Sequence, residues 1–145
     1  MQEDDPKLVE AMLKHCYHQT YDEVTVIDQD DKGVDIFDAK MFCFADKYQC
    51  RPLARDIAAY FEDTFKQDDD TDDLDLTLFP SLDIIYDLPA GSLLTVFQNM
   101  FQRAFVGKLP MYLKSPKFQE LYQRRALLAF DCLDMIKQHY NLRAR

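Results

Sequence analysis

The sequence predicts a mainly α-helical chain with at most one short strand. Three observations favour this fold class. Apolar residues recur at helical spacing along most of the chain, two proline-led segments have the features of helix starts, and the composition is 48% hydrophobic with three glycines among 145 residues. Such a composition excludes disordered and collagen-like chains. The length suits one domain, or one domain with an appendage.

The amino-terminal part is predicted to form a helix followed by one strand. Asp5 precedes Pro6, and a carboxylate before a proline is a helix-start signature, since proline suits the first helical position. Apolar spacing then predicts a helix over about residues 6–17. The β-branched run at 24–27 favours a short strand, and the polar stretch 28–35 breaks the chain.

A pair of packed helices is predicted next. From residue 35 onward an apolar stripe runs at helical spacing, and Pro52 restarts the chain before a second stripe that continues to Phe65. The two helices join at about residues 49–51. Their aromatic side chains are expected to form a core, and each buried one would contribute roughly 1.5–3 kcal/mol.

An acidic segment divides the chain in this interpretation. Six aspartates lie between residues 68 and 75, a density of like charge that predicts a solvated linker. The predicted organisation is therefore a first domain over 1–66, an acidic linker over 67–76 and a helical extension over 77–145. Within the extension we expect helices at 78–86, at 93–105 with Ser92 as its cap, after Ser115 and Pro116, and at about 125–140, stopping at Asn141.

Charge and cysteine usage bear on the environment of the protein. Seventeen basic and 26 acidic residues give a net charge of −9, which disfavours nucleic acid and anionic membranes as partners. The polar, acidic start resembles no targeting signal, and no apolar run approaches the roughly 18 residues that a membrane span needs. We therefore expect a soluble intracellular protein, cytoplasmic or nuclear, with its four cysteines reduced.

Three groups of residues carry a resemblance to a known family. The first is an acidic–proline helix start with its apolar stripe and a tyrosine-rich turn; the second is an alanine–aspartate–lysine–tyrosine segment followed by a proline-led helix; the third is the tail. Their members are Asp4, Asp5, Pro6, Val9, Met12, Leu13, Tyr17, Tyr21 and Asp22; Ala45, Asp46, Lys47, Tyr48, Cys50, Pro52, Leu53 and Ala58; and Ser115, Pro116, Phe118 and Leu133. In this order they resemble the second half of a fungal BTB/POZ domain followed by its helical extension.

The chain departs from the family pattern in two places. The family usually has glycine where this chain has Gln19, and a left-handed backbone there would cost roughly 1–2 kcal/mol. The family also begins with strands and a helix that bear the dimer contacts, and the expected counterpart is absent before Asp4. Met1 then begins either a truncated product or a partial domain, and both alternatives remain open.

The resemblance implies a truncated BTB/POZ-like fold, from an α+β family, and a non-enzymatic role in protein–protein interaction. It implies self-association or adaptor binding, in some relatives to cullin-type ubiquitin ligases. The family's adaptor surface draws on the helices corresponding to residues 41–49 and 53–65. The contact residues expected on this basis are Met41, Phe44, Tyr48, Leu53, Ile57, Tyr60 and Phe61. If the covering strands are missing, apolar surface on these helices needs a partner.

Enzymatic and metal-binding alternatives have weaker support. No serine or cysteine lies in a nucleophile motif, so we expect neither an enzyme nor a cofactor. The rival hypothesis is a small metal-dependent regulator using His15, His18, Cys43 and Cys50, although these lack the paired spacing of zinc sites. A third alternative is a non-functional fragment.

One segment also imitates a calcium-binding loop. Asp28, Asp30 and Gly33 match the first, third and sixth positions of an EF-hand loop. Lys32 and Ala39 then occupy the fifth and twelfth positions, where oxygen ligands are needed. Calcium binding is therefore not expected there.

Overall fold

The computed structural model describes residues 5–16, 34–65, 71–89 and 91–144, and these form helices joined by short turns. No strand occurs within these ranges, so the predicted mainly helical class is confirmed; the strand predicted at 24–27 lies outside the described residues. The elements are α1 (Pro6–Cys16), α3 (Val34–Lys47), α4 (Arg51–Phe65), α5 (Thr71–Leu76), α6 (Leu78–Ile85), α7 (Leu94–Ala104), the 3₁₀ helix η1 (Val106–Lys108), α8 (Leu109–Leu113), α9 (Pro116–Arg124) and α10 (Ala126–Ala144).

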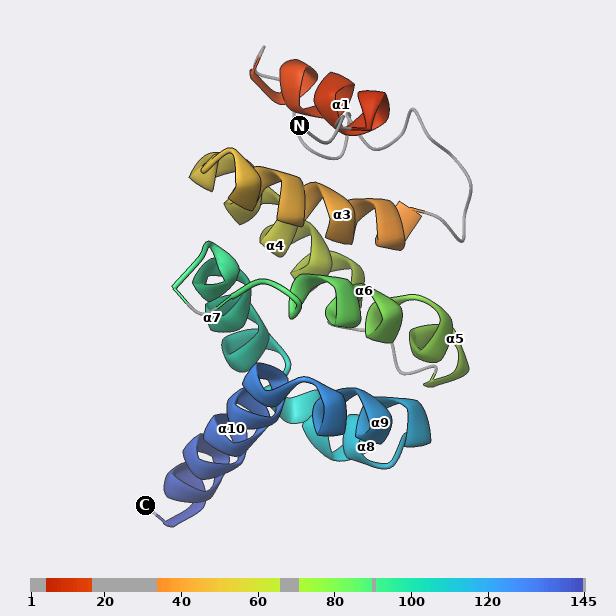
Figure 1. The fold of residues 1–145 in the computed structure, drawn as a ribbon. Helices are drawn as coiled ribbons and strands as arrows, with labels where there is room; N and C mark the ends of the chain where they lie inside the picture. The colour runs from red at the N-terminus through yellow and green to blue at the C-terminus, as the bar shows by residue number, and fades with distance from the viewer. Residues whose placement is uncertain (1–4, 17–33, 66–70, 90, 145) are drawn as a thin grey trace.

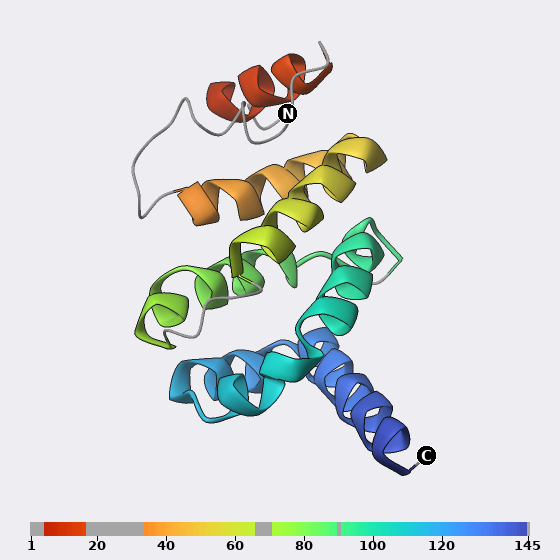
Figure 2. The same cartoon turned by 180° about the vertical axis from the view of Figure 1, so that it is seen from behind.

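The helices stack in layers from α1 to α10 (Figure 1). Helix α1 lies on α3, which packs against both α4 and α6, while α7 packs against α4. Helices α9 and α10 follow on the other side of α6 and α7. The view from behind shows α1 and the carboxyl-terminal half of α10 at opposite ends of the molecule (Figure 2).

The predicted helix starts are confirmed by their hydrogen bonds. The Lys7 backbone N–H donates to Asp5 Oδ1 (2.9 Å) at the start of α1. Ser115 Oγ accepts from the Phe118 N–H (3.4 Å), with proline at the first position of α9. Both caps satisfy amide groups that the first helical turn leaves without partners.

Two side chains bond backbone N–H groups at the start of α7. Ser92 Oγ accepts from the Leu94 N–H (3.2 Å), but the residue at the cap position is Leu93, one residue after the cap that the sequence predicted. In addition, Asp46 Oδ1 accepts from the Leu93 N–H (2.8 Å), so a carboxylate near the end of α3 caps the start of α7. A carboxylate is favourable at a helix amino terminus because the exposed N–H groups there carry partial positive charge. This bond joins two helices across the predicted domain boundary.

The turn between α3 and α4 is a Schellman motif without glycine. Gln49 has a left-handed backbone (φ 55°), the Cys50 N–H donates to the Ala45 carbonyl (2.8 Å), and the Gln49 N–H donates to the Asp46 carbonyl (3.1 Å). These two bonds satisfy carbonyls at the helix end. The packed pair predicted around residues 49–51 is therefore confirmed, with the turn formed by a residue that pays a steric cost for its φ angle.

A continuous series of aromatic rings fills the core. The Phe97 ring lies 5.7 Å from Phe42, 5.5 Å from Phe61 and 6.2 Å from Phe101 between ring centroids. The series continues through Phe105, Tyr112, Phe118 and Tyr122 into α9. Edge-to-face and offset pairs of this kind add stabilisation beyond the apolar area that they bury. One hydrophobic core therefore spans the described helices on both sides of residues 67–76.

The predicted acidic linker is partly a packed helix, which corrects the interpretation of its charge. Residues Thr71–Leu76 form α5, which packs against α6. Leu74 is fully buried, and Asp75 accepts a hydrogen bond from Ser115 Oγ (2.9 Å). Asp73 is exposed and Asp75 is bonded to Ser115, so the charge of these residues does not prevent Leu74 from packing.

Two further differences concern the carboxyl-terminal part. Helix α10 continues to Ala144 and does not stop at Asn141 as expected. The short helices η1 and α8 were not predicted, because Gly107 and Pro110 interrupt the helical spacing there. Helix ends are the least certain part of a pattern, since termini fray and lack fixed periodicity.

Candidate protein-interaction surface

The contact residues expected from the family resemblance lie mostly in the core. Met41, Leu53, Ile57 and Phe61 have no exposed surface, and Phe44 is buried. A contact surface built from these five side chains would require the helices to separate. The reason is that α6 and α7 cover the faces of α3 and α4 that the sequence analysis expected to be open. Tyr48 is exposed and Tyr60 is partly exposed, so these two can reach a partner directly.

Large apolar side chains that do reach solvent concentrate on one helix. Phe130, Leu133 and Ile136 of α10 are 60%, 51% and 41% exposed. They follow one another at intervals of three residues, which keeps neighbours within reach of one another on a helix surface. The other exposed large apolar side chains among the described residues are Val9, Leu13, Tyr48 and Leu76.

Helix α10 is apolar on two faces. Leu128, Cys132 and Met135 are buried against the body of the molecule, whereas Phe130 and Leu133 are exposed. A helix in a surface position usually carries one apolar stripe, with polar residues opposite. The second apolar face of α10 is what distinguishes it from the helices that only complete the core.

An apolar groove runs beside this second face. It has a volume of about 340 Å³ and lies between α10 and the α8–α9 pair. Its lining consists of Leu113, Tyr122, Ala129, Cys132, Leu133 and Ile136. None of these side chains carries a charge at neutral pH, and one wall is formed by exposed leucine and isoleucine. The groove is thus suited to take up apolar side chains of another molecule.

A buried carboxyl group fixes α10 on the body. Asp131 Oδ2 accepts from the Tyr86 hydroxyl (2.5 Å), and its Oδ1 accepts from the side-chain amides of Gln98 (3.2 Å) and Gln102 (2.9 Å). Burial raises the pKa of Asp131 above its ordinary value, although the three hydrogen bonds act in the opposite direction. Burial, with the adjacent Asp131, also raises the pKa of Tyr86 well above 10, which keeps its hydroxyl a donor.

Arginine pairs hold the start of α10 against α6. Arg125 Nε donates to Asp83 Oδ1 (2.9 Å), and one of its terminal nitrogens donates to Asp87 Oδ1 (2.7 Å). The hydrogen bond to Asp83 is the main reason that the pKa of Arg125 is raised. Together with the hydrogen bonds of Asp131, these contacts hold α10 against the body of the molecule.

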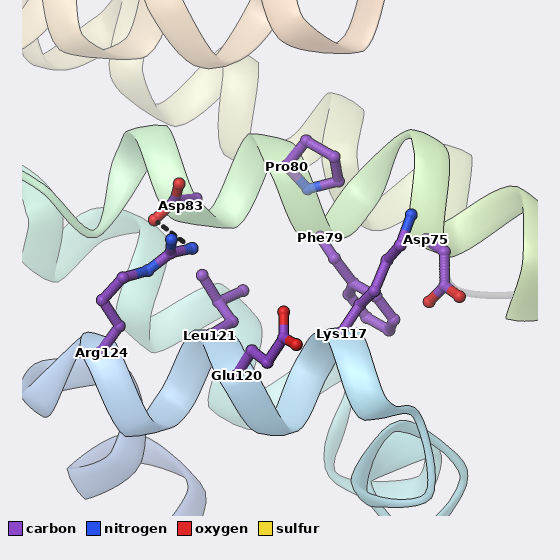
Figure 3. Close-up of a pocket in the computed structure, with 8 residues that line it drawn as sticks. All are labelled: Asp75, Phe79, Pro80, Asp83, Lys117, Glu120, Leu121 and Arg124. Carbon is purple, nitrogen blue, oxygen red and sulfur yellow. Dashed lines mark ion pairs between the residues drawn. The ribbon is translucent and has the colours of Figure 1, made fainter.

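A second hollow, between α6 and α9, is lined by charged side chains. It has a volume of about 250 Å³. Figure 3 shows Lys117, Glu120 and Arg124 extending from α9 toward α6, where Arg124 pairs with Asp83 (3.3 Å). Its apolar base is formed by Phe79 and Leu121, which are buried. The hollow offers both signs of charge at a surface between two packed helices and contains no histidine, cysteine or serine.

Cys43 and Cys50, the two cysteines of the rival metal hypothesis, are free thiols that are each partly buried. The Cys43 thiol donates to the Ile84 carbonyl (3.6 Å), and burial, with smaller effects from Asp46 and Asp87, raises its pKa to about 11. Burial likewise raises the pKa of Cys132, which is not among the ligands of that hypothesis, to about 12. A thiol binds metal as the thiolate, which these values disfavour at neutral pH.

The structure describes only some of the remaining candidate metal ligands. No group of three or more histidine, cysteine, aspartate or glutamate side chains is placed to hold a metal ion within the described part of the chain. His18 and the calcium-loop imitation at 28–33 lie outside the described residues, as does the side chain of His15. Ala39, the twelfth position of that imitation, is buried in α3.

Comparison of the chain with protein-family models, with curated proteins and with solved structures found no match. The resemblance to a BTB/POZ domain therefore stays a prediction. None of the helices within the described ranges is long and apolar enough to cross a membrane.

The groove was not predicted from the sequence. Leu113 lies in a short helix that was not predicted, and Tyr122 was not singled out. A signal was present in α10, where Phe130 and Leu133 lie about 140° or more around the helix from Leu128 and Met135 at 100° per residue. Apolar residues on more than one face of a helix indicate that more than one face will be covered.

Proposed function

We propose that this protein is a non-enzymatic protein–protein interaction module whose contact surface is the groove beside α10. The observation that carries the proposal is the set of three large, exposed apolar side chains, Phe130, Leu133 and Ile136, next to an apolar groove. Clustered apolar side chains at a surface mark interaction sites, because burying them against a partner removes them from water.

The arrangement of this surface favours a role in protein binding over a role in catalysis. Anchor residues in protein interfaces are large side chains that enter well-packed pockets near the centre of the contact. Phe130 can act as an anchor inserted into a partner, while the groove can receive an anchor from it. The Asp131 and Arg125 contacts hold α10 in place before binding, which reduces the entropy lost on association.

The family resemblance adds to this proposal an expected kind of partner. It favours self-association or adaptor binding, with a cullin-type ubiquitin ligase as one class of partner. Of the contact residues expected on that basis, Tyr48 and Tyr60 reach the surface, at the end of α3 and on α4. They would provide contacts separate from the groove beside α10.

Site-specific photo-crosslinking tests the proposal. Benzoylphenylalanine replaces Phe130 in one version of the protein and Leu76 in a control, because both side chains are about 60% exposed and Leu76 lies on α5. Each version is produced in the cells that naturally make the protein and irradiated. We expect discrete protein adducts at position 130 that disappear when Leu133→Ser and Ile136→Ser are added. Equal labelling at both positions, or no adduct at position 130, would contradict the proposal.

A further inference from the structure

The charge of the chain is divided unevenly along its length. Residues 1–105 contain nine basic and 23 acidic side chains, a net charge of −14. Residues 106–145 contain eight basic and three acidic side chains, a net charge of +5. The groove beside α10 lies wholly within the second part, since its lining residues run from Leu113 to Ile136. An acidic segment of another molecule is therefore repelled by the larger part of the protein and attracted to this end.

Two lysines are close neighbours, along the chain or on the helix surface, of residues that line the apolar groove. Lys114 directly follows Leu113, and Lys137 lies one helical turn after Leu133, on the side of α10 that also bears Phe130. Both lysines are exposed, and neither is paired with a carboxylate among the residues that the structure describes. The groove thus has an apolar interior with a positive charge near each wall.

The dimensions of the groove suit a short helix. From Ala129 to Ile136, α10 rises about 10 Å, or two helical turns. A helix that lies in such a groove inserts apolar side chains spaced three or four residues apart and leaves its other face in solvent. Polar residues that flank the inserted ones then meet the rim of the groove.

We infer that the groove binds an amphipathic helix of another protein whose polar face is acidic. Its apolar side chains occupy the space between Tyr122 and Leu133, and its carboxylates lie near Lys114 and Lys137. This inference rests on the proposed function and names the chemistry of its partner. The lysines contribute mainly to selectivity and to the rate of association, while the apolar contacts contribute most of the affinity.

The same charges disfavour a second copy of this chain as the occupant. In a twofold dimer the same patch of each subunit meets its counterpart. Contact through this groove would bring Lys114 and Lys137 of one copy close to the same lysines of the other. Like charges brought together in an interface are unfavourable, whereas an acidic helix neutralises both lysines at once.

The test uses two fluorescein-labelled helical peptides of 14 residues. Both carry leucines at helical spacing on one face, with glutamates on the other face of the probe and glutamines in their place in the matched control. Fluorescence anisotropy measures binding to the full-length protein and to three variants: the groove variant Leu133→Ser with Ile136→Ser, the rim variant Lys114→Glu with Lys137→Glu, and the control Leu76→Ser. All five positions are exposed, so the fold should persist, and circular dichroism checks that it does.

We expect the acidic peptide to bind the unmodified protein and the Leu76→Ser control equally. The groove variant and the rim variant should each bind it at least tenfold more weakly, as should the unmodified protein with the glutamine peptide. Raising the salt concentration from 50 to 300 mM should weaken binding to the unmodified protein more than binding to the rim variant.

Several results would overturn the inference. They are equal affinity for the two peptides, unchanged affinity in the rim variant, absence of binding by the acidic peptide, and a dimer in light scattering that the groove variant converts to a monomer. If the photo-crosslinks at position 130 are nevertheless found, the interaction module stands and only the acidic helix is wrong. If those crosslinks are absent, the proposed function itself fails.

Discussion

At the scale of single residues, Asp131 determines how α10 sits on the molecule. It is a nearly fully buried carboxyl group that accepts hydrogen bonds from Tyr86, which directly follows α6, and from Gln98 and Gln102 of α7. An ionised carboxylate in such a place is costly unless it is well bonded. Since burial raises its pKa, the folded state holds the proton of Asp131 more tightly than the unfolded chain does.

This difference predicts a pH dependence with a definite sign. The stabilisation that comes from the raised pKa is fully present below the ordinary value of 3.8 and is lost as the pH rises through the raised value. Asp131→Asn cannot ionise and keeps an oxygen acceptor for Gln98 and Gln102. The variant should therefore gain stability relative to the unmodified protein as the pH rises from 4 toward neutrality.

Urea unfolding at a series of pH values measures this effect. Asp63→Asn, an exposed substitution on α4, serves as the matched control and should follow the unmodified protein. Parallel pH profiles for Asp131→Asn and the unmodified protein would show that Asp131 has no raised pKa in the folded state.

Residue identity predicted helix caps better than it predicted contacts. Asp5, Ser92 and Ser115 act on amide groups two or three positions away, so a short stretch of sequence determines what they do. Whether Met41 or Phe61 is exposed depends on whether α6 and α7 pack over them. No local sequence pattern predicts that packing. The expected contact set therefore consisted largely of side chains that the core uses.

At the scale of elements, the end of α3 carries a conformational cost. Gln49 adopts a left-handed backbone that costs a residue with a Cβ atom about 1–2 kcal/mol. Its side-chain amide donates to the Asp46 carbonyl (2.7 Å), which offsets only part of that cost, because the bond is exposed to water.

Gln49→Gly should consequently stabilise the protein. Glycine removes the steric cost, and after the entropy of a more flexible unfolded chain is subtracted we expect a gain of about 0.5–1 kcal/mol. Gln49→Ala is the control: it keeps the Cβ atom and loses the amide bond, so it should be slightly destabilising. Thermal unfolding followed by circular dichroism compares the three proteins. A glycine variant no more stable than the alanine variant would mean that the φ angle of Gln49 carries no measurable cost.

The elements themselves could be predicted where one apolar stripe lies between clear start and stop signals. This holds for α1, α4 and α9, each of which begins at or next to a proline. Helix α5 was not predicted from the sequence because its aspartates outnumber its one buried apolar residue, Leu74. The groove was missed for a related reason: it needs α8, α9 and α10 to be placed together, and tertiary packing decides that.

At the scale of the whole molecule, the core is continuous where the sequence predicted a division. Phe97 of α7 contacts the rings of Phe42 and Phe61 on one side of residues 67–76 and that of Tyr86 on the other. The Asp46 cap on α7 joins the same two parts through a hydrogen bond. Apolar periodicity indicates that faces will be buried but not which helices bury them, so the charged interval by itself does not decide how many folding units the chain has.

A shared core predicts that both parts unfold together. The chain contains no tryptophan, so Tyr60→Trp and Tyr122→Trp, made in separate proteins, provide single fluorescent reporters on α4 and α9. Their urea midpoints should coincide, as expected for one cooperative unit. Adding Phe97→Leu should lower the stability seen by both reporters by the same amount, about 1–3 kcal/mol for a core substitution. Because Phe97 touches rings from α3, α4, α6 and α7, a change felt by only one reporter would mean that residues 1–66 and 77–145 fold as separate domains after all.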